Sequence, residues 1–293
     1  MNTVSSDYAT AIAHLTEIQA QEAADETMNS VCCTKLLTHG SRVEHVVILM
    51  HGLTNCPHQY AELAPLFFEQ GYNVLIPRMP YSGLADRMTD QLKFLTAQSL
   101  RDCSNTMVDI AHGLGEHVTF AGLSAGGIMA AWVAQYRSDV DKVVIIAPSF
   151  TISTHIGIGT GRIATLLLRL LPDISTARFM PFQDGPTYSY LGYSSRALAQ
   201  VMHLGFSVLS AAKKSLPAAQ SVLFIINDSD PAVNNKVAWT LVHRWRARGA
   251  TNIVTYEFGT EHALIHDIVD PNQVQQQTAF VYPILLDLIT RQE

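Results

Sequence analysis

Charged residues are scarce in this chain, and several features that would indicate particular partners are missing. Only 15% of its 293 residues are charged, and the formal net charge is −6. This balance gives no reason to expect nucleic acid or an anionic membrane as a partner. No stretch reaches the roughly 18 consecutive apolar residues that would indicate a membrane span, and Arg169 interrupts the most apolar run, 165–171. The N-terminus lacks a basic region followed by an apolar core, so we expect no signal peptide and a cytoplasmic location.

The cysteines do not form a metal-binding pattern. Cys32 and Cys33 are adjacent, whereas Cys56 and Cys103 stand alone. Zinc sites usually take pairs of ligands about two to four residues apart on tight turns. The sequence therefore predicts no metal and no cofactor.

Apolar residues make up 48% of the chain, enough for one large globular domain or one domain with an insertion. Over most of the length, predicted strands alternate with predicted helices. The strands are 44–50, 73–76, 117–121, 142–147, 221–227 and 252–258, and the helices are 7–28, 58–70, 96–114, 127–136, 234–249 and 272–291. This alternation predicts an α/β fold whose mostly parallel sheet is covered by helices on both faces.

The alternation stops at Pro148 and resumes after about residue 215. Residues 149–215 are therefore predicted to be an inserted helical cap, which divides the core into 1–148 and 216–293. The cap segment contains only two acidic residues, Asp173 and Asp184, among many apolar and aromatic ones. Because ligands bind at the carboxyl edge of such sheets, we expect some apolar cap residues to line the substrate cavity, with Leu167 and Leu168 as candidates.

The N-terminal region predicts a hairpin. Ser30–Thr38 alternates like a strand, residues 39–41 turn, and the strand at 44–50 follows. An antiparallel pairing would place Cys32 and Cys33 near the loop that contains Cys56. A disulfide from Cys33, or from Cys32, to Cys56 is then possible if the Cα atoms come within about 7 Å. The alternative is that all four cysteines stay free, as a reducing cytosol would favour.

One motif carries the chemistry. Residues 122–126 read Gly-Leu-Ser-Ala-Gly, with a predicted strand before them and a predicted helix after them. In this context the sharp turn exposes the hydroxyl of Ser124, and the flanking glycines leave room for the bend. The pattern predicts that Ser124 is a catalytic nucleophile.

Such a serine needs a base and a group that orients the base, and in this architecture the chain order is serine, acid, histidine. The strand at 221–227 is followed by Asp228 and Asp230. We favour Asp230 because it precedes a proline and an apolar residue that can fix the loop. After the last strand, His262 and His266 both precede the Asp270-Pro271 pair, and periodicity does not separate them.

Two backbone N–H groups should stabilise the oxyanion. One is that of Ala125, directly after the nucleophile. The other is expected in the loop after the strand at 44–50, where the N–H of Leu53 is the candidate. His51 lies in the same loop. Its position suits a residue that shapes the loop better than it suits a catalytic base.

Taken together, these segments resemble the α/β-hydrolase superfamily, and within it the bacterial carboxylesterases and monoacylglycerol lipases with a small helical cap. The resemblance covers residues 45 to 293 and rests on the serine motif, on 47–52, 71–78 and 230–233, and on the histidine loop. It implies the oxyanion donors Leu53 and Ala125. His262 matches a pattern in which an aspartate follows five residues later, whereas His266 matches a His-Asp pair before Asp-Pro, and we favour His266.

One segment departs from that group. Many relatives read Pro-Gly-His-Gly where this chain reads Pro80-Tyr81-Ser82-Gly83. Because this loop borders the cap, Tyr81 is predicted to contact substrate.

These features predict a serine hydrolase that cleaves carboxylic esters through an acyl-enzyme on Ser124. The expected partner is a small ester with an apolar acyl or aromatic group. An acyltransferase or a thioesterase with the same triad is the alternative. A non-catalytic ligand-binding member of the superfamily is a third reading, although such a protein would not need a complete triad.

Overall fold

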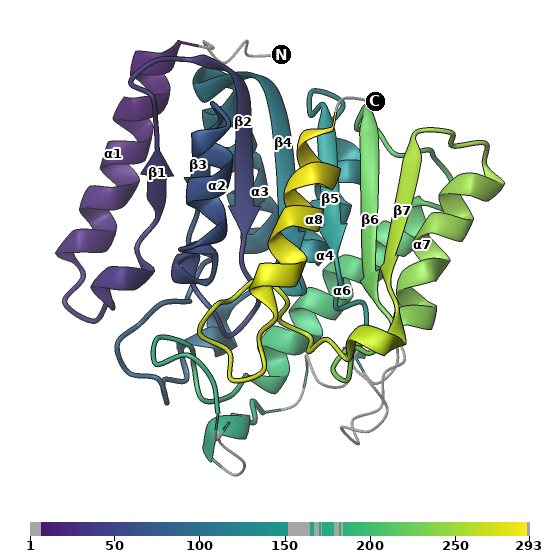
Figure 1. Ribbon diagram of the computed structural model, residues 1–293. Coiled ribbons are helices and arrows are strands. Elements are labelled where there is room, and N and C mark those ends of the chain that lie inside the picture. Colours follow the sequence, from purple (N-terminus) through teal and green to yellow (C-terminus); the bar gives the residue numbers. More distant parts are fainter. Residues whose placement is uncertain are drawn as a thin grey trace.

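A computed structural model describes residues 7–151, 165–166, 170, 172–178, 182 and 184–291 (Figure 1). A seven-stranded sheet forms its centre, in the order β1-β3-β2-β4-β5-β6-β7. The strands are β1 (Lys35–Leu37), β2 (Val43–Met50), β3 (Asn73–Ile76), β4 (Gly115–Leu123), β5 (Lys142–Ile146), β6 (Ser221–Asn227) and β7 (Ile253–Phe258). All neighbours pair in parallel except β1 and β3. The predicted α/β fold class is confirmed.

Helices cover both faces of the sheet. The α-helices are α1 (Tyr8–Ala24), α2 (Leu63–Glu69), α3 (Ala97–Leu114), α4 (Ala125–Tyr136), α6 (Ser195–Ala211), α7 (Asn235–Ala247) and α8 (Thr278–Thr290). Short 3₁₀ helices are η1 (Ser30–Cys32), η2 (Pro57–Tyr60), η3 (Gln91–Phe94), η5 (Thr176–Arg178) and η6 (Thr260–His262). Among the described helices, none is long and apolar enough to cross a membrane.

The alternation of side chains along the strands builds two separate cores. Val46, Ile48 and Met50 of β2 join the core packed against α1, α3, α4, α6 and α7. Val47 and Leu49 point the other way and join the core packed against α2 and α8. Figure 1 shows α8 crossing in front of the sheet and α4 behind it. A strand that is buried on both faces reads as a continuous apolar run, which is why β2, β4 and β6 are evident in the sequence.

The predicted N-terminal hairpin is wrong. Both edges of β2 are occupied, by β3 and by β4, so β1 pairs antiparallel with the outer edge of β3 instead. The strand is also shorter than predicted. Ser30–Cys32 forms η1, whose first turn is capped by the Asn29 side chain.

Other boundaries shift for local reasons. The predicted helix 58–70 separates into η2 and α2, and the predicted helix 272–291 begins only at Thr278, where the Gln276 side chain accepts from its N–H and its hydroxyl. α6 lies in the range predicted as cap, but it packs against α3 and α4 in the main core. The domain boundaries at residues 148 and 215 stay predictions.

Candidate active site

Parallel strands place the residues that follow them at one edge of the sheet. The loops after β2, β4, β6 and β7 contain Leu53, Ser124, Asp230 and His266 respectively. Residues far apart in the sequence therefore meet at the carboxyl edge of the sheet, where ligands bind in such folds.

Ser124 occupies a strained turn between β4 and α4. Its φ is +59° and its ψ is −111°, a conformation that L residues rarely adopt. The turn requires glycine on both sides. A Cβ on Gly122 would lie 2.1 Å from the Gly126 carbonyl oxygen, and a Cβ on Gly126 would lie 2.2 Å from that of Met50.

A continuous chain of hydrogen bonds leads from the serine to a buried carboxylate. The Oγ of Ser124 lies 2.8 Å from Nε2 of His266, and Nδ1 of His266 lies 2.6 Å from Oδ2 of Asp230. Since a carboxylate only accepts, Nδ1 carries the proton, and Nε2 is free to accept from the serine hydroxyl. The Asp230 side chain is fully buried, and its other oxygen accepts from the N–H groups of Ala232 and Val233.

The two rival residues lie elsewhere. Asp228 is exposed. His262 lies in η6, with its ring 4.5 Å from that of Phe280 and its Nε2 3.4 Å from a carboxylate oxygen of Glu261. The structure therefore brings Asp230 and His266 to Ser124, and neither rival.

The surroundings of His266 favour its protonated form. Burial works against a charge on this imidazole, but the charges of Asp230 and Asp267 and the hydrogen bond to Asp230 outweigh burial. The pKa of His266 is therefore raised above the ordinary value of 6.5.

The loop after β2 presents a backbone donor. Among the described residues, the N–H groups of Leu53 and Ala125 have no intramolecular acceptor. The carbonyl of Gly52, in the same peptide plane as the Leu53 N–H, accepts from Nδ1 of His51 at 2.7 Å and from the N–H of Asn55 at 3.2 Å. Holding that carbonyl fixes the direction of the Leu53 N–H.

His51 is a buried structural histidine. Its Nε2 accepts from the N–H of Met79 at 3.0 Å. Burial lowers its pKa to about 4, so the ring is neutral near pH 7 and can donate at one nitrogen and accept at the other. These contacts support the predicted role in shaping the loop.

A cavity of roughly 790 Å³ opens onto Ser124 and His266. Its described lining includes the apolar or aromatic residues Leu53, Phe182, Tyr193, Leu198 and Val233. Tyr81, predicted to contact substrate, is not among the described lining residues. Its ring lies 6.1 Å from that of Phe94, and its carbonyl accepts from the hydroxyl of Tyr190. Leu167 and Leu168 lie outside the described residues.

Among the described residues, no three His, Cys, Asp or Glu side chains gather as metal ligands.

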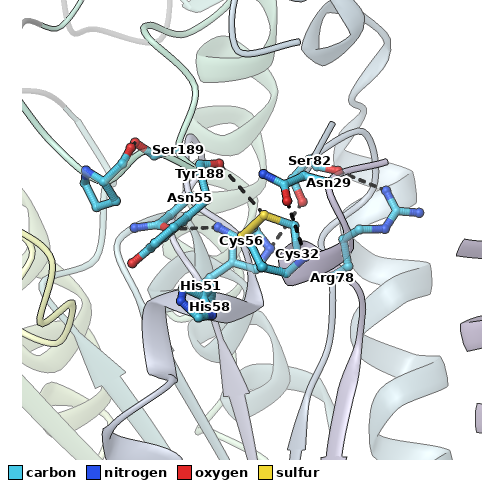
Figure 2. Close-up of a disulfide and its surroundings, with 12 residues drawn as sticks. Asn29, Cys32, His51, Asn55, Cys56, His58, Arg78, Ser82, Tyr188 and Ser189 are labelled. Atoms are coloured by element: carbon cyan, nitrogen blue, oxygen red, sulfur yellow. Dashed lines mark hydrogen bonds between the residues drawn. A yellow bond between two sulfur atoms is a disulfide. The ribbon is translucent and has the colours of Figure 1, made fainter. Parts of the chain in front are cut away.

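A disulfide anchors the loop behind the oxyanion donor. Cys32 in η1 is bonded to Cys56, which directly precedes η2, with their Cα atoms 5.2 Å apart (Figure 2). The bond forms although the predicted hairpin does not. The cysteine bonded to Cys56 is Cys32 and not Cys33, which the sequence analysis put first. Cys32 is fully buried beside Cys56 and Tyr188, whereas Cys33 is free and only partly buried.

Reduction of this disulfide is expected to lower the free energy of unfolding by about 3 kcal/mol, because the bond closes a loop of 24 residues and restricts the unfolded chain. Urea unfolding with and without a dithiol reductant measures the change. The Cys103→Ser variant, which removes a free thiol, should show the same change on reduction. Alkylation of all four cysteines in the unreduced protein would contradict the bond.

Comparisons with known proteins fit this geometry. A family model described as the alpha/beta hydrolase fold matches residues 45–170. The thermostable monoacylglycerol lipase of Bacillus sp. (strain H-257) is 23% identical over 193 residues, which are 64% of this chain and 71% of that protein.

Solved structures cover more of the chain. One of the metagenome-derived lipolytic enzymes LipS and LipT superposes with a TM-score of 0.66 at 17% identity, covering 89% of this chain and 98% of that one. The monoacylglycerol lipase of Paleococcus ferrophilus superposes with a TM-score of 0.64 at 16% identity, covering 87% and 98%. The chain therefore has the α/β-hydrolase fold and resembles the monoacylglycerol lipases and esterases that share it.

Proposed function

We propose that this protein is a serine hydrolase that cleaves carboxylic esters. The observation that carries the proposal is the hydrogen-bond chain from Ser124 through His266 to Asp230, at the base of a largely apolar cavity. A protein that only binds a ligand has no need of this chain. The activities named for its relatives, lipase and esterase, support the same reaction class.

Each residue of the site has its own role in the reaction. Ser124 Oγ attacks the ester carbonyl while Nε2 of His266 takes its proton, and the N–H groups of Leu53 and Ala125 stabilise the oxyanion. The intermediate collapses to an acyl-enzyme as His266 returns the proton to the leaving alcohol. Water, deprotonated by His266, then releases the acid and restores the serine. Asp230 keeps the imidazole in the required tautomer.

The cavity lining favours an ester with an apolar acyl chain or an aromatic group. Hydrolysis of nitrophenyl esters of increasing acyl length, with Ser124→Ala as the control, tests both the reaction and this preference. Transfer of the acyl group to another acceptor, or hydrolysis of thioesters, would need no different triad. Parallel assays with thioesters and with added alcohols therefore belong to the same experiment.

The disulfide indicates the redox conditions of the cellular compartment in which the protein is found. Such bonds persist in oxidising environments and are rare in a reducing cytosol. The Cys32–Cys56 bond therefore favours an oxidising compartment over the cytoplasm expected from the sequence.

Activity should fall as the pH is lowered. The base must be neutral to accept the serine proton, and the pKa of His266 is raised. We expect kcat/KM to decrease as the pH falls through this raised pKa, with the midpoint above 6.5. A pH series with a neutral nitrophenyl ester measures it. A midpoint well below that value would mean that burial, and not the carboxylates, dominates at His266.

A further inference from the structure

Gln59 joins two loops of the proposed site. It lies in η2 with 1% of its surface exposed. Its Oε1 accepts from the N–H of Gly52 at 3.0 Å, and its Nε2 donates to Oδ2 of Asp267 at 2.8 Å. Both ends of one amide are thus used, one on the oxyanion loop and the other on the histidine loop.

Asp267 directly follows His266 and is held by several donors. Its Oδ2 also accepts from the side-chain amides of Asn55 and Gln273, at 3.2 Å and 3.0 Å. Its Oδ1 accepts from the backbone N–H of Asp270 at 3.2 Å. The carboxylate is therefore fixed from two segments, 55–59 and 270–273, although it makes no hydrogen bond with Ser124 or with the His266 ring among the bonds of the described residues.

We propose that Gln59 and Asp267 are positioning residues that set the oxyanion loop against the histidine loop. This inference rests on the proposed function, because it concerns where the Leu53 N–H stands relative to Ser124 and His266. Neither residue belongs to the triad, and neither supplies the oxyanion N–H groups.

The geometry explains why such a link is needed. His51 and Asn55 hold the carbonyl of Gly52, and Gln59 holds its N–H. The residue that precedes the oxyanion donor is thus fixed on both of its peptide groups. Without the amide of Gln59, a buried N–H loses its partner, and the loop must shift to satisfy it. Displacements of about 0.5–1 Å are enough to impair a preorganised site.

The first test replaces Gln59 with methionine, which keeps the length of the side chain and removes both hydrogen bonds. We expect kcat for a nitrophenyl ester to fall about 10- to 100-fold with KM changed less than about threefold, since the loss of an entire oxyanion donor costs about 10²–10³. The matched control is Gln135→Met. Gln135 is also a buried glutamine with hydrogen bonds at both ends, to Ser215, Leu216 and Trp245, but it lies on α4 away from the cavity.

The second test replaces Gln59 with glutamate, which matches the shape of glutamine only when its carboxyl is protonated. The ionisable group in contact with it would be Asp267, which directly follows His266 in the chain and on which the charge of the nearby Asp270 also acts. Two carboxyls at this distance share one proton and hold it to higher pH than either would alone. The ratio of variant to wild-type kcat should therefore be highest at low pH and decline as the pH rises, whereas the ratio for Gln59→Met should stay flat.

The outcomes separate this inference from the proposed function. If the wild type hydrolyses esters, Ser124→Ala does not, and Gln59→Met keeps kcat within threefold of the wild type, the positioning role is wrong while the function stands. A Gln59→Glu variant as impaired as Gln59→Met at every pH also overturns it. A circular dichroism melt of each variant shows whether it is folded. If Gln59→Met does not fold, the pH dependence of Gln59→Glu decides.

Discussion

Ser124→Ala is expected to reduce ester hydrolysis by on the order of 10⁶ in kcat, the effect of removing the nucleophile in a comparable serine hydrolase. The variant lacks only the Oγ that lies 2.8 Å from His266, so no acyl-enzyme can form. Nitrophenyl ester turnover measures the loss. Trapping of acyl-enzyme by acid quench, followed by mass spectrometry, shows whether the acyl group resides on Ser124 in the wild type.

The substitution should leave the fold intact. The turn is held by backbone contacts, from the N–H of Ser124 to the Ile146 carbonyl and from the N–H of Ser149 to the Ser124 carbonyl, and alanine keeps both. The positive φ of residue 124 is as strained for alanine as for serine. An unchanged melting temperature with activity retained within tenfold of the wild type would show that Ser124 is not the nucleophile.

The sequence reveals the turn around Ser124 because the geometry leaves few choices. Gly122 and Gly126 stand where a Cβ would collide with backbone oxygens, so the motif and the turn imply each other. Asp230 is predictable for a related reason. Its Oδ1 accepts from the N–H groups of Ala232 and Val233, so the residues just after Pro231 hold the carboxylate toward the base.

Periodicity could not separate His262 from His266 because both lie in irregular backbone, so the choice of His266 rested on the family resemblance alone. Between β7 and the Asp270-Pro271 pair, η6 is followed by Ala263 in the left-handed conformation, with φ +47°. This turn sends His262 toward Phe280 and lets His266 reach Ser124. No local sequence pattern predicts the direction in which the chain leaves the turn at Ala263.

The sequence also could not predict which strands and side chains pair over long distances in the chain. The hairpin prediction assumed that a short loop joins paired strands, but β2 was already paired on both edges with strands that come later in the chain. Similarly, nothing in the sequence around Gln59 indicates that its amide meets Asp267, 208 residues away. Such contacts depend on the packing of the whole sheet edge.

The second large effect concerns the two histidines of this loop. His266→Ala should lower kcat nearly as much as Ser124→Ala, because in a comparable hydrolase loss of the base alone costs about as much as loss of the whole triad. His262→Ala should stay within about threefold of the wild type, since His262 contacts Phe280 and Glu261 and not the serine. The two variants make the same chemical change four residues apart, so each is the control for the other. Turnover of one nitrophenyl ester by both variants measures the difference.

A further variant tests whether His266 acts on Ser124 and not merely on the loop. Residues that act as a unit are strongly non-additive, so the double variant Ser124→Ala with His266→Ala should be no slower than either single variant. If His262→Ala is the inactive variant, the base is misassigned although the serine mechanism stands. If both single variants remain active, the base does not come from this loop, and the 2.8 Å contact between His266 and Ser124 has no part in the reaction.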